Sequence, residues 1–174
     1  MARVPYQDEA TKPDQAALID RIKTERGGRL LNLYKALLNS PPVAEGWLNL
    51  FTAIRQKGTL PDRDRELAIM RVAVINGALY EFNAHVPFAL KSGMTQPQID
   101  DLAWWRDSDR FSERERAVLA YTDTMTKNVQ IPDDVFAAVR KFFDDRELVE
   151  LTATVGGYNL VSRFLEAMQI DHDK

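Results

Sequence analysis

The sequence contains no cysteine among its 174 residues. Without a thiol the chain can form no disulfide, no thiolate metal site and no cysteine nucleophile, and it cannot be a thiol peroxidase. It also has no apolar run near the roughly 20 residues that a membrane-spanning helix needs. Residues 1–14 hold no apolar run of the kind found in a secretory signal. We therefore expect a cytoplasmic protein without a membrane partner.

A strong excess of one charge is also missing. The chain has 23 Lys and Arg against 26 Asp and Glu, which gives a formal net charge of −3. This balance argues against a broad electrostatic footprint for nucleic acid. Histidine is scarce, and the two that occur, His85 and His172, are far apart in the sequence. A two-histidine metal site is therefore not expected.

What the sequence does contain is helical periodicity. From Pro13 onward apolar residues recur at helical spacing, and no pair of strands is evident, so the predicted fold class is all-α. We expect a flexible N-terminal arm over residues 1–12 and a single all-α domain over 13–174. The expected helices cover about 13–26, 30–38, 41–54, 62–76, 78–91, 95–105, 112–121, 132–143 and 145–168.

Several helix starts carry capping signals. Asp62 is a candidate N-cap for the most apolar helix. Thr95 with Gln98, and Ser112 with Glu115, have the spacing of a capping box, in which the two side chains satisfy each other's backbone N–H groups.

Two features of the last helix have more than one interpretation. Gly156 and Gly157 mark either a break in this helix or a close approach to another helix. The tetrapeptide Asp-Arg-Glu-Leu occurs at both 64–67 and 145–148. It is either a common composition of a first helical turn or the trace of a duplicated helical hairpin.

The segment from Glu66 to His85 holds the candidate chemistry. Glu81 and His85 are spaced i,i+4, so they project from one face of a helix. A histidine can act as acid or base near neutral pH, and a neighbouring carboxylate would orient its ring and favour the imidazolium. Glu66, one helix earlier among apolar residues, is a candidate proton carrier if it is buried.

Each of these residues also has a purely structural interpretation. Glu81 and His85 could be an ordinary surface pair that contributes about 0.2–0.5 kcal/mol. Glu66 could be a carboxylate that suits the first turn of its helix, and Tyr80 could belong to the core or to an interface.

The same segment resembles the carboxymuconolactone decarboxylase and alkyl hydroperoxidase D-like superfamily. The resemblance rests on residues 65–72 (RELAIMRV), 76–81 (NGALYE), 85–87 (HVP) and 93–95 (GMT), and it extends over about residues 28–169. It implies an all-α alkyl hydroperoxidase D-like helical bundle with an internal pseudo-repeat. It also implies a homo-oligomer, a trimer or a hexamer, with sites near subunit interfaces.

The peroxidase branch of this superfamily carries a Cys-x-x-Cys pair, a histidine and a glutamate on the preceding helix. By this resemblance the glutamate corresponds to Glu66 and the histidine to His85, whereas the two cysteine positions hold Ala78 and Glu81. A peroxidase or peroxiredoxin role would therefore be a family label that these residues contradict.

The decarboxylase branch lacks the cysteine pair, and its sequences resemble Glu-x-x-x-His at the same place. Residues 81–85 fit that pattern. The resemblance implies loss of carbon dioxide from a small carboxylate or lactone, without a cofactor. Such a reaction needs a cation for the substrate carboxylate and a proton donor for the carbanion. His85, oriented by Glu81, is the candidate donor and Glu66 the candidate relay. Arg71 and Tyr80 are the candidate substrate-binding residues.

We therefore predict a decarboxylase-like lyase with Glu66, Glu81 and His85 as catalytic residues. The alternative is a non-catalytic family member that binds a small ligand or a partner as an oligomer. A redox role through the thiols of a partner is a third hypothesis.

Overall fold

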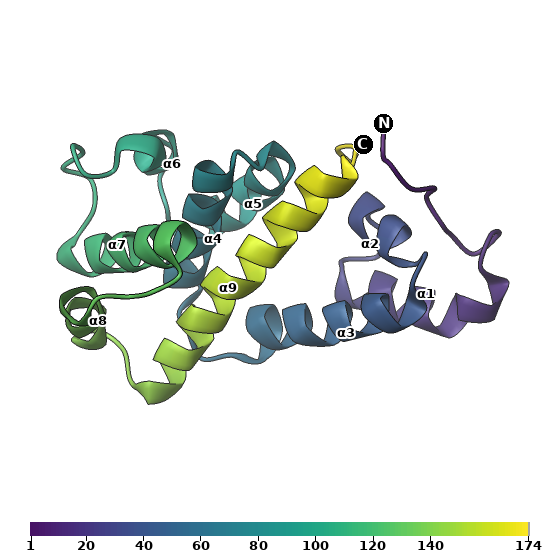
Figure 1. Cartoon of the computed structure of the whole chain (residues 1–174), viewed down its shortest axis with the longest axis horizontal. Coiled ribbons are helices and arrows are strands. Elements are labelled where there is room, and N and C mark those ends of the chain that lie inside the picture. The colour runs from purple at the N-terminus through teal and green to yellow at the C-terminus, as the bar shows by residue number, and fades with distance from the viewer. Residues whose placement is uncertain (174) are drawn as a thin grey trace. The chain divides into compact units, whose positions relative to one another are not determined.

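A computed structural model describes residues 1–173 of the chain, and every regular element within them is helical (Figure 1). The predicted all-α class is thus confirmed. The α-helices are α1 (Ala16–Glu25), α2 (Asn32–Leu37), α3 (Pro41–Thr52), α4 (Asp62–Asn76), α5 (Leu79–Lys91), α6 (Gln96–Asp101), α7 (Glu113–Asn128), α8 (Asp133–Arg140) and α9 (Asp145–Met168). Two 3₁₀ turns, η1 (Pro13–Gln15) and η3 (Leu102–Trp104), and a π-helical turn, η2 (Ala53–Lys57), complete the set.

The chain divides into two compact units. The first unit consists of Met1–Lys57 together with the chain from Phe164 onward, and the second unit is Gly58–Arg163. The helix α9 therefore begins in the second unit and ends in the first. The predicted division into an arm over 1–12 and one domain over 13–174 stays a prediction.

The first unit is assembled from stretches far apart in the sequence. The ring of Trp47 in α3 packs against that of Phe164, with 5.3 Å between the ring centroids. The backbone N–H of Arg3 donates to the carbonyl of Met168 over 2.9 Å. The backbone N–H of Gln7 donates to the carbonyl of Lys35 over 3.0 Å. Hydrogen bonds thus hold residues from the predicted arm against α2 and the end of α9.

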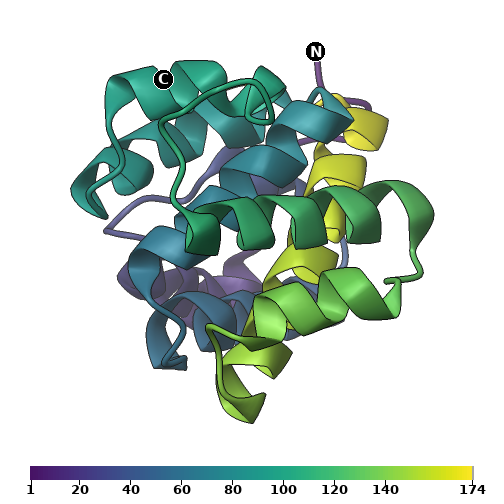
Figure 2. The same ribbon diagram turned by 90° about the vertical axis from the view of Figure 1, so that its left-hand side faces the viewer.

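The second unit is built around α4, which packs against α5 and α7 (Figure 2). The middle of α4 is buried without a break from Glu66 to Ala73, which agrees with the prediction that the most apolar helix is central. The helix α7 is joined to α9 by a 2.8 Å hydrogen bond between the hydroxyls of Tyr121 and Thr152. Gly156 lies within α9, where an added Cβ would meet Met125 of α7 at 3.4 Å. The glycine therefore serves a close helix approach, and α9 continues through it without a break.

Both predicted capping boxes are confirmed, at Thr95 for α6 and at Ser112 for α7. The predicted N-cap at Asp62 is wrong. Pro61 occupies that position with an extended ψ of 136°, and Asp62 is the first residue of α4. No side chain caps this helix, because proline has no side-chain oxygen that could accept from the first backbone N–H groups.

The repeated tetrapeptide lies in the first turns of α4 and α9. Whether it reflects duplication stays a prediction. None of the helices formed by residues 1–173 combines the length and the apolar character that crossing a bilayer requires.

Candidate active site

The connection between α4 and α5 positions the candidate site. The helix α4 ends at Gly77, whose φ of 65° and ψ of 24° lie in the left-handed region that favours glycine. After this turn α5 starts at Leu79 and packs back against α4. Glu66 from α4 consequently faces Glu81 and His85 from α5.

The structure brings the three predicted residues together around the imidazole ring. Nδ1 of His85 lies 2.6 Å from Oε2 of Glu66, and Nε2 lies 3.0 Å from Oε1 of Glu81. All three are buried, with exposed fractions of 2% for Glu66, 4% for Glu81 and 3% for His85. The alternative of an exposed surface pair is therefore wrong for Glu81 and His85. We call Glu66, Glu81 and His85 the carboxylate–histidine triad.

The electrostatics of the triad favour a protonated ring. Burial alone lowers the pKa of His85, because it penalises the imidazolium. The hydrogen bonds and charges of Glu66 and Glu81 act in the opposite direction and prevail, so the pKa is raised above its ordinary 6.5. When both ring nitrogens face carboxylate oxygens, both can donate only if the ring is an imidazolium.

Aromatic rings enclose the imidazole. Tyr158 from α9 meets it edge-on, with ring planes at 89° and centroids 5.2 Å apart. Phe88, on the next turn of α5, lies 5.6 Å from it. Because the three side chains of the triad are buried, water screens their charges little, which strengthens each charge interaction.

The raised pKa makes a testable prediction about stability. A group whose pKa is higher in the folded than in the unfolded state stabilises the fold fully below its unfolded pKa. It loses that contribution as the pH rises through the folded pKa. The charged groups that face His85 are Glu66 from α4 and Glu81 from α5, and Tyr158 packs on the ring from α9. We expect the difference in unfolding free energy between the wild type and His85→Gln to be largest near pH 6 and to shrink at higher pH.

Urea unfolding of both proteins between pH 6 and pH 9 measures this difference. His172→Gln is the matched control, since it removes the other histidine, and its difference from the wild type should not follow the profile of His85. A His85→Gln difference that stays constant with pH would contradict the raised pKa.

Arg71 lies elsewhere in the second unit. It is five residues after Glu66 on α4, which places the two side chains about 140° apart around the helix axis. Its guanidinium is committed to Asp123, through bonds of 2.5 and 3.1 Å, and to the carbonyl of Leu102 at 2.7 Å. That Arg71 binds a substrate carboxylate stays a prediction, and the buried ion pair with Asp123 does not support it.

Tyr80 is buried in α5, directly before Glu81. It is five residues before His85, about 140° around the helix, so the two side chains leave α5 on different faces. Burial agrees with its core interpretation, and a contact with substrate stays a prediction.

The triad itself offers no evident metal site. Among residues 1–173 no group of three or more His, Cys, Asp or Glu side chains is arranged to hold a metal ion. The two carboxylates lie on opposite ring nitrogens, whereas metal ligands must converge on one point.

One charged residue beside the triad was not singled out by the sequence patterns. Arg65 lies next to Glu66 in α4, and its Nε is 3.5 Å from Oε1 of that glutamate. The signal that could have found it is its position beside a candidate carboxylate in the first turns of a largely apolar helix.

Comparison with known proteins adds a family match at this site. The model of the carboxymuconolactone decarboxylase family matches residues 41–124, a range that includes the whole triad. The uncharacterized protein YdfG of Bacillus subtilis is 30% identical over 106 residues, which cover 60% of this chain and 72% of YdfG.

Three solved structures share the fold. A protein of unknown function from Agrobacterium tumefaciens is 28% identical, with a TM-score of 0.73 over 78% of this chain and 94% of that one. The alkylhydroperoxidase AhpD core of a peroxidase-related protein from Ralstonia eutropha has a TM-score of 0.84 at 20% identity, over 99% of this chain and 93% of that one. The debrominase Bmp8, in complex with 2,3,4-tribromopyrrole, has a TM-score of 0.81 at 16% identity, over 99% of this chain and 94% of that one. The alkyl hydroperoxidase D-like fold predicted from the sequence is thus confirmed.

Proposed function

We propose, since the chain belongs to the carboxymuconolactone decarboxylase family, that it is an enzyme of cofactor-independent acid–base chemistry. The substrate would be a small carboxylate or lactone, and the reaction a decarboxylation or a related proton transfer. The observation that carries this proposal is the burial of His85 between the carboxylates of Glu66 and Glu81.

In the proposed reaction His85 is the general acid. Cleavage of the bond between the substrate and its carboxylate releases carbon dioxide and leaves an electron pair on carbon. The Nε2 proton of His85 moves to that carbon, and the neutral ring then takes a proton from water. Glu66, on Nδ1 at 2.6 Å, holds the ring in place and stabilises its charged form between turnovers.

Glu81 has a different place in this scheme. Its contact with Nε2 is the longer of the two, at 3.0 Å. The substrate atom that accepts the proton would replace Glu81 as the partner of Nε2. By the family resemblance, Glu81 occupies one of the two positions that hold cysteine in the peroxidase branch. The absence of cysteine from the chain therefore also supports acid–base chemistry over thiol chemistry.

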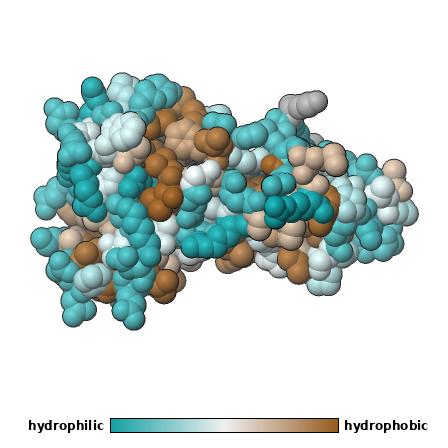
Figure 3. All heavy atoms as spheres, turned by 45° about the horizontal axis from the view of Figure 1, so that its top comes forward, coloured by the Kyte–Doolittle hydropathy of each residue, from teal (hydrophilic) through white to brown (hydrophobic). Residues whose placement is uncertain are grey.

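The proposal includes a homo-oligomer, a trimer or a hexamer. Large apolar side chains are exposed on the two helices that contact His85, namely Leu79, Phe88 and Leu90 of α5 and Leu160 of α9. Figure 3 shows hydrophobic residues, in brown, gathered on the surface of the second unit. Exposed apolar residues of this kind are typical of surfaces that another protein chain covers.

A screen followed by an assay tests the function. Thermal shifts with small unsaturated carboxylates and carboxylated lactones would identify binders, because a ligand at 100 times its Kd adds about 2.7 kcal/mol of stability. Binders carrying ¹³C in the carboxylate would then be followed for release of ¹³CO₂. We expect release by the wild type and a rate about 10²–10⁴ times lower for His85→Gln.

His172→Gln is the matched control and should release carbon dioxide at the wild-type rate. Equal rates for the wild type and His85→Gln would contradict the proposed role of His85. A screen in which ligands bind but none loses its carboxylate would favour the alternative, a ligand-binding family member. That alternative has one observation in its favour, since both ring nitrogens of His85 already have partners within the chain.

A further inference from the structure

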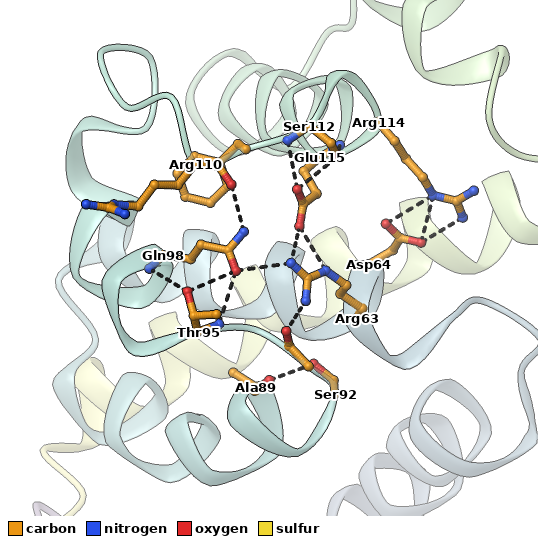
Figure 4. Close-up of polar contacts among 12 residues, drawn as sticks. Arg63, Asp64, Ala89, Ser92, Thr95, Gln98, Arg110, Ser112, Arg114 and Glu115 are labelled. Atoms are coloured by element: carbon orange, nitrogen blue, oxygen red, sulfur yellow. Dashed lines mark hydrogen bonds and ion pairs between the residues drawn. The ribbon is translucent and has the colours of Figure 1, made fainter.

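The arginines near the start of α4 differ in how their donors are used. Nε and Nη2 of Arg63 donate to Oε1 of Glu115 over 2.9 and 2.7 Å, and Nη2 also reaches Gln98 at 3.1 Å. Its Nη1 donates to the carbonyl of Gly93 (Figure 4). Figure 4 thus shows a guanidinium whose donors on every side are engaged.

Arg114 from α7 is engaged in the same way. Its Nε and Nη2 donate to the carboxylate of Asp64, the latter over 2.7 Å, and Nη1 reaches the carbonyl of Phe142 (Figure 4 shows the pair with Asp64). Arg63 and Arg114 therefore serve to join the helices of the second unit, and every nitrogen of both guanidinium groups has a partner within the chain.

Arg65 follows Arg63 by two residues in α4, and one of its nitrogens has no hydrogen bond. Its side chain is only 12% exposed, and Nη1 donates to Asp62, a residue that is itself 76% exposed. Its Nε is fully buried and has no hydrogen-bond partner among the described residues. Oε1 of Glu66 is 3.5 Å from both Nε and Nη2, whereas charge-assisted bonds of this type measure about 2.7–2.9 Å.

The weakly engaged donors lie on one edge of the guanidinium, where Nε has no hydrogen bond and Nη2 has only the 3.5 Å bond to Glu66. Nε and Nη2 form the edge that binds carboxylates with two parallel hydrogen bonds. A buried donor left without a partner is unfavourable, so a ligand that satisfies it gains affinity. One carboxylate links this edge to the imidazole, because Oε1 of Glu66 faces Arg65 while Oε2 contacts His85.

The charges around the triad point to the same ligand chemistry. Glu66 and Glu81 with a protonated His85 sum to one negative charge, which alone would repel an anion. Arg65 adds a positive charge beside these three buried groups, so it lowers the electrostatic barrier to a substrate carboxylate.

We propose that Arg65 is the substrate-binding residue that takes the ligand's carboxylate at its Nε–Nη2 edge, beside the triad. This inference rests on the proposed function, since it assigns the cation that decarboxylation of a small carboxylate requires. It gives Arg65 the role that the sequence patterns had suggested for Arg71.

A matched pair of ligands tests the proposal. Crotonate is a small unsaturated carboxylate, and crotonamide is its neutral counterpart. NMR titration of the full chain would follow the signals of Glu66 and His85 and give the Kd of each. We expect crotonate to bind saturably to the wild type and at least 10 times more weakly to Arg65→Gln, with the Kd of crotonamide unchanged.

Two further variants separate binding from structure. Arg110→Gln removes the same charge from an exposed position of the second unit and should leave both Kd values unchanged. Arg65→Lys keeps the charge without the planar edge and should weaken crotonate several-fold, which also provides a test if Arg65→Gln fails to fold. The proposal is overturned if the wild type does not bind crotonate, or if both Arg65 variants bind it as the wild type does. Equal weakening of both ligands by the variants would also overturn it, because it indicates a structural role.

The outcomes remain distinct from those of the proposed function. If crotonate binds through Arg65 but no labelled carboxylate releases carbon dioxide, the proposed enzymatic function is overturned and the carboxylate-binding role of Arg65 is supported. If turnover needs His85 but the KM of Arg65→Gln is unchanged, the enzymatic function is supported and the carboxylate-binding role of Arg65 is overturned.

Discussion

Replacing Asp123 by asparagine is expected to destabilise the chain by about 3–5 kcal/mol, because it leaves the buried guanidinium of Arg71 without a counter-charge. Both residues are buried, and their bonds join α4 to α7. Arg71 also donates to the carbonyl of Leu102 in η3, and Nε1 of Trp105 lies 3.4 Å from Asp123. One carboxylate therefore stabilises the junction of three elements of the second unit.

Urea unfolding at neutral pH measures this loss. Lys127→Ala is the control, since Lys127 pairs with the same carboxylate at 3.5 Å but is 52% exposed. It should cost less than about 1 kcal/mol, as exposed pairs do. A loss for Asp123→Asn no larger than that of the control would show that Arg71 finds other compensation. The double variant Arg71→Met with Asp123→Leu should recover much of the loss, because no buried charge remains.

The same ion pair makes the second unit sensitive to acid. Burial alone would raise the pKa of Asp123, but the hydrogen bond and charge of Arg71 outweigh it, and the pKa lies below its ordinary 3.8. For a lowered pKa the stabilisation is complete above the unfolded value and is lost as the pH falls through the folded value. The difference between the wild type and Asp123→Asn should therefore decline only in strong acid.

The second large effect concerns the two carboxylates of the triad. Glu66→Gln is expected to lower the rate of the proposed reaction by about 10²-fold or more, within the range for loss of acid–base assistance. The amide keeps the size of the side chain but removes the charge that holds His85 protonated at Nδ1. Glu81→Gln should have a smaller effect, since Glu81 makes the longer contact and the substrate is expected to displace it.

Rates of ¹³CO₂ release and an NMR titration of the His85 ring would check both variants together. In each variant the pKa of His85 should fall relative to the wild type, because burial lowers it once a carboxylate that raised it is gone. A larger rate loss for Glu81→Gln than for Glu66→Gln would reverse the assigned roles. An unchanged ring titration in Glu66→Gln would contradict the electrostatic argument itself.

Local features were predictable because their causes are local. The capping boxes at Thr95 and Ser112 depend on residues three apart, and both form as predicted. The last helix also has its predicted bounds, Asp145 to Met168. Which interpretation of Gly156 holds could not be decided from the sequence, since it depends on Met125 of another helix.

The triad was only partly predictable from spacing. The i,i+4 relation of Glu81 and His85 places both on one face of a helix, but it does not say whether that face is buried. Glu66 is 19 residues from His85 and meets it only because Gly77 reverses the chain. Its inclusion among the catalytic candidates came from its place among apolar residues and from the family resemblance, not from its spacing to His85.

The arginines show most plainly where sequence reasoning stops. Arg65 lies in the charged first turns of α4 and Arg71 lies in its apolar middle, and this sequence context does not say which of them faces the triad. The angular separation of each from Glu66 was available, but the partner that captures Arg71, Asp123, lies 52 residues away. Helix packing decided the matter.

The division of the chain into two units bears on how it folds during synthesis. Residues leave the ribosome from the N-terminus onward, and domains generally fold as they are completed. The first unit includes Met1–Lys57, which emerge before the second unit. Trp47 of this segment cannot pack against Phe164 until that residue has also been synthesised. The contiguous second unit, which carries the triad, is complete before that partner appears. Residues Met1–Lys57 are therefore translated before the second unit but finish folding after it.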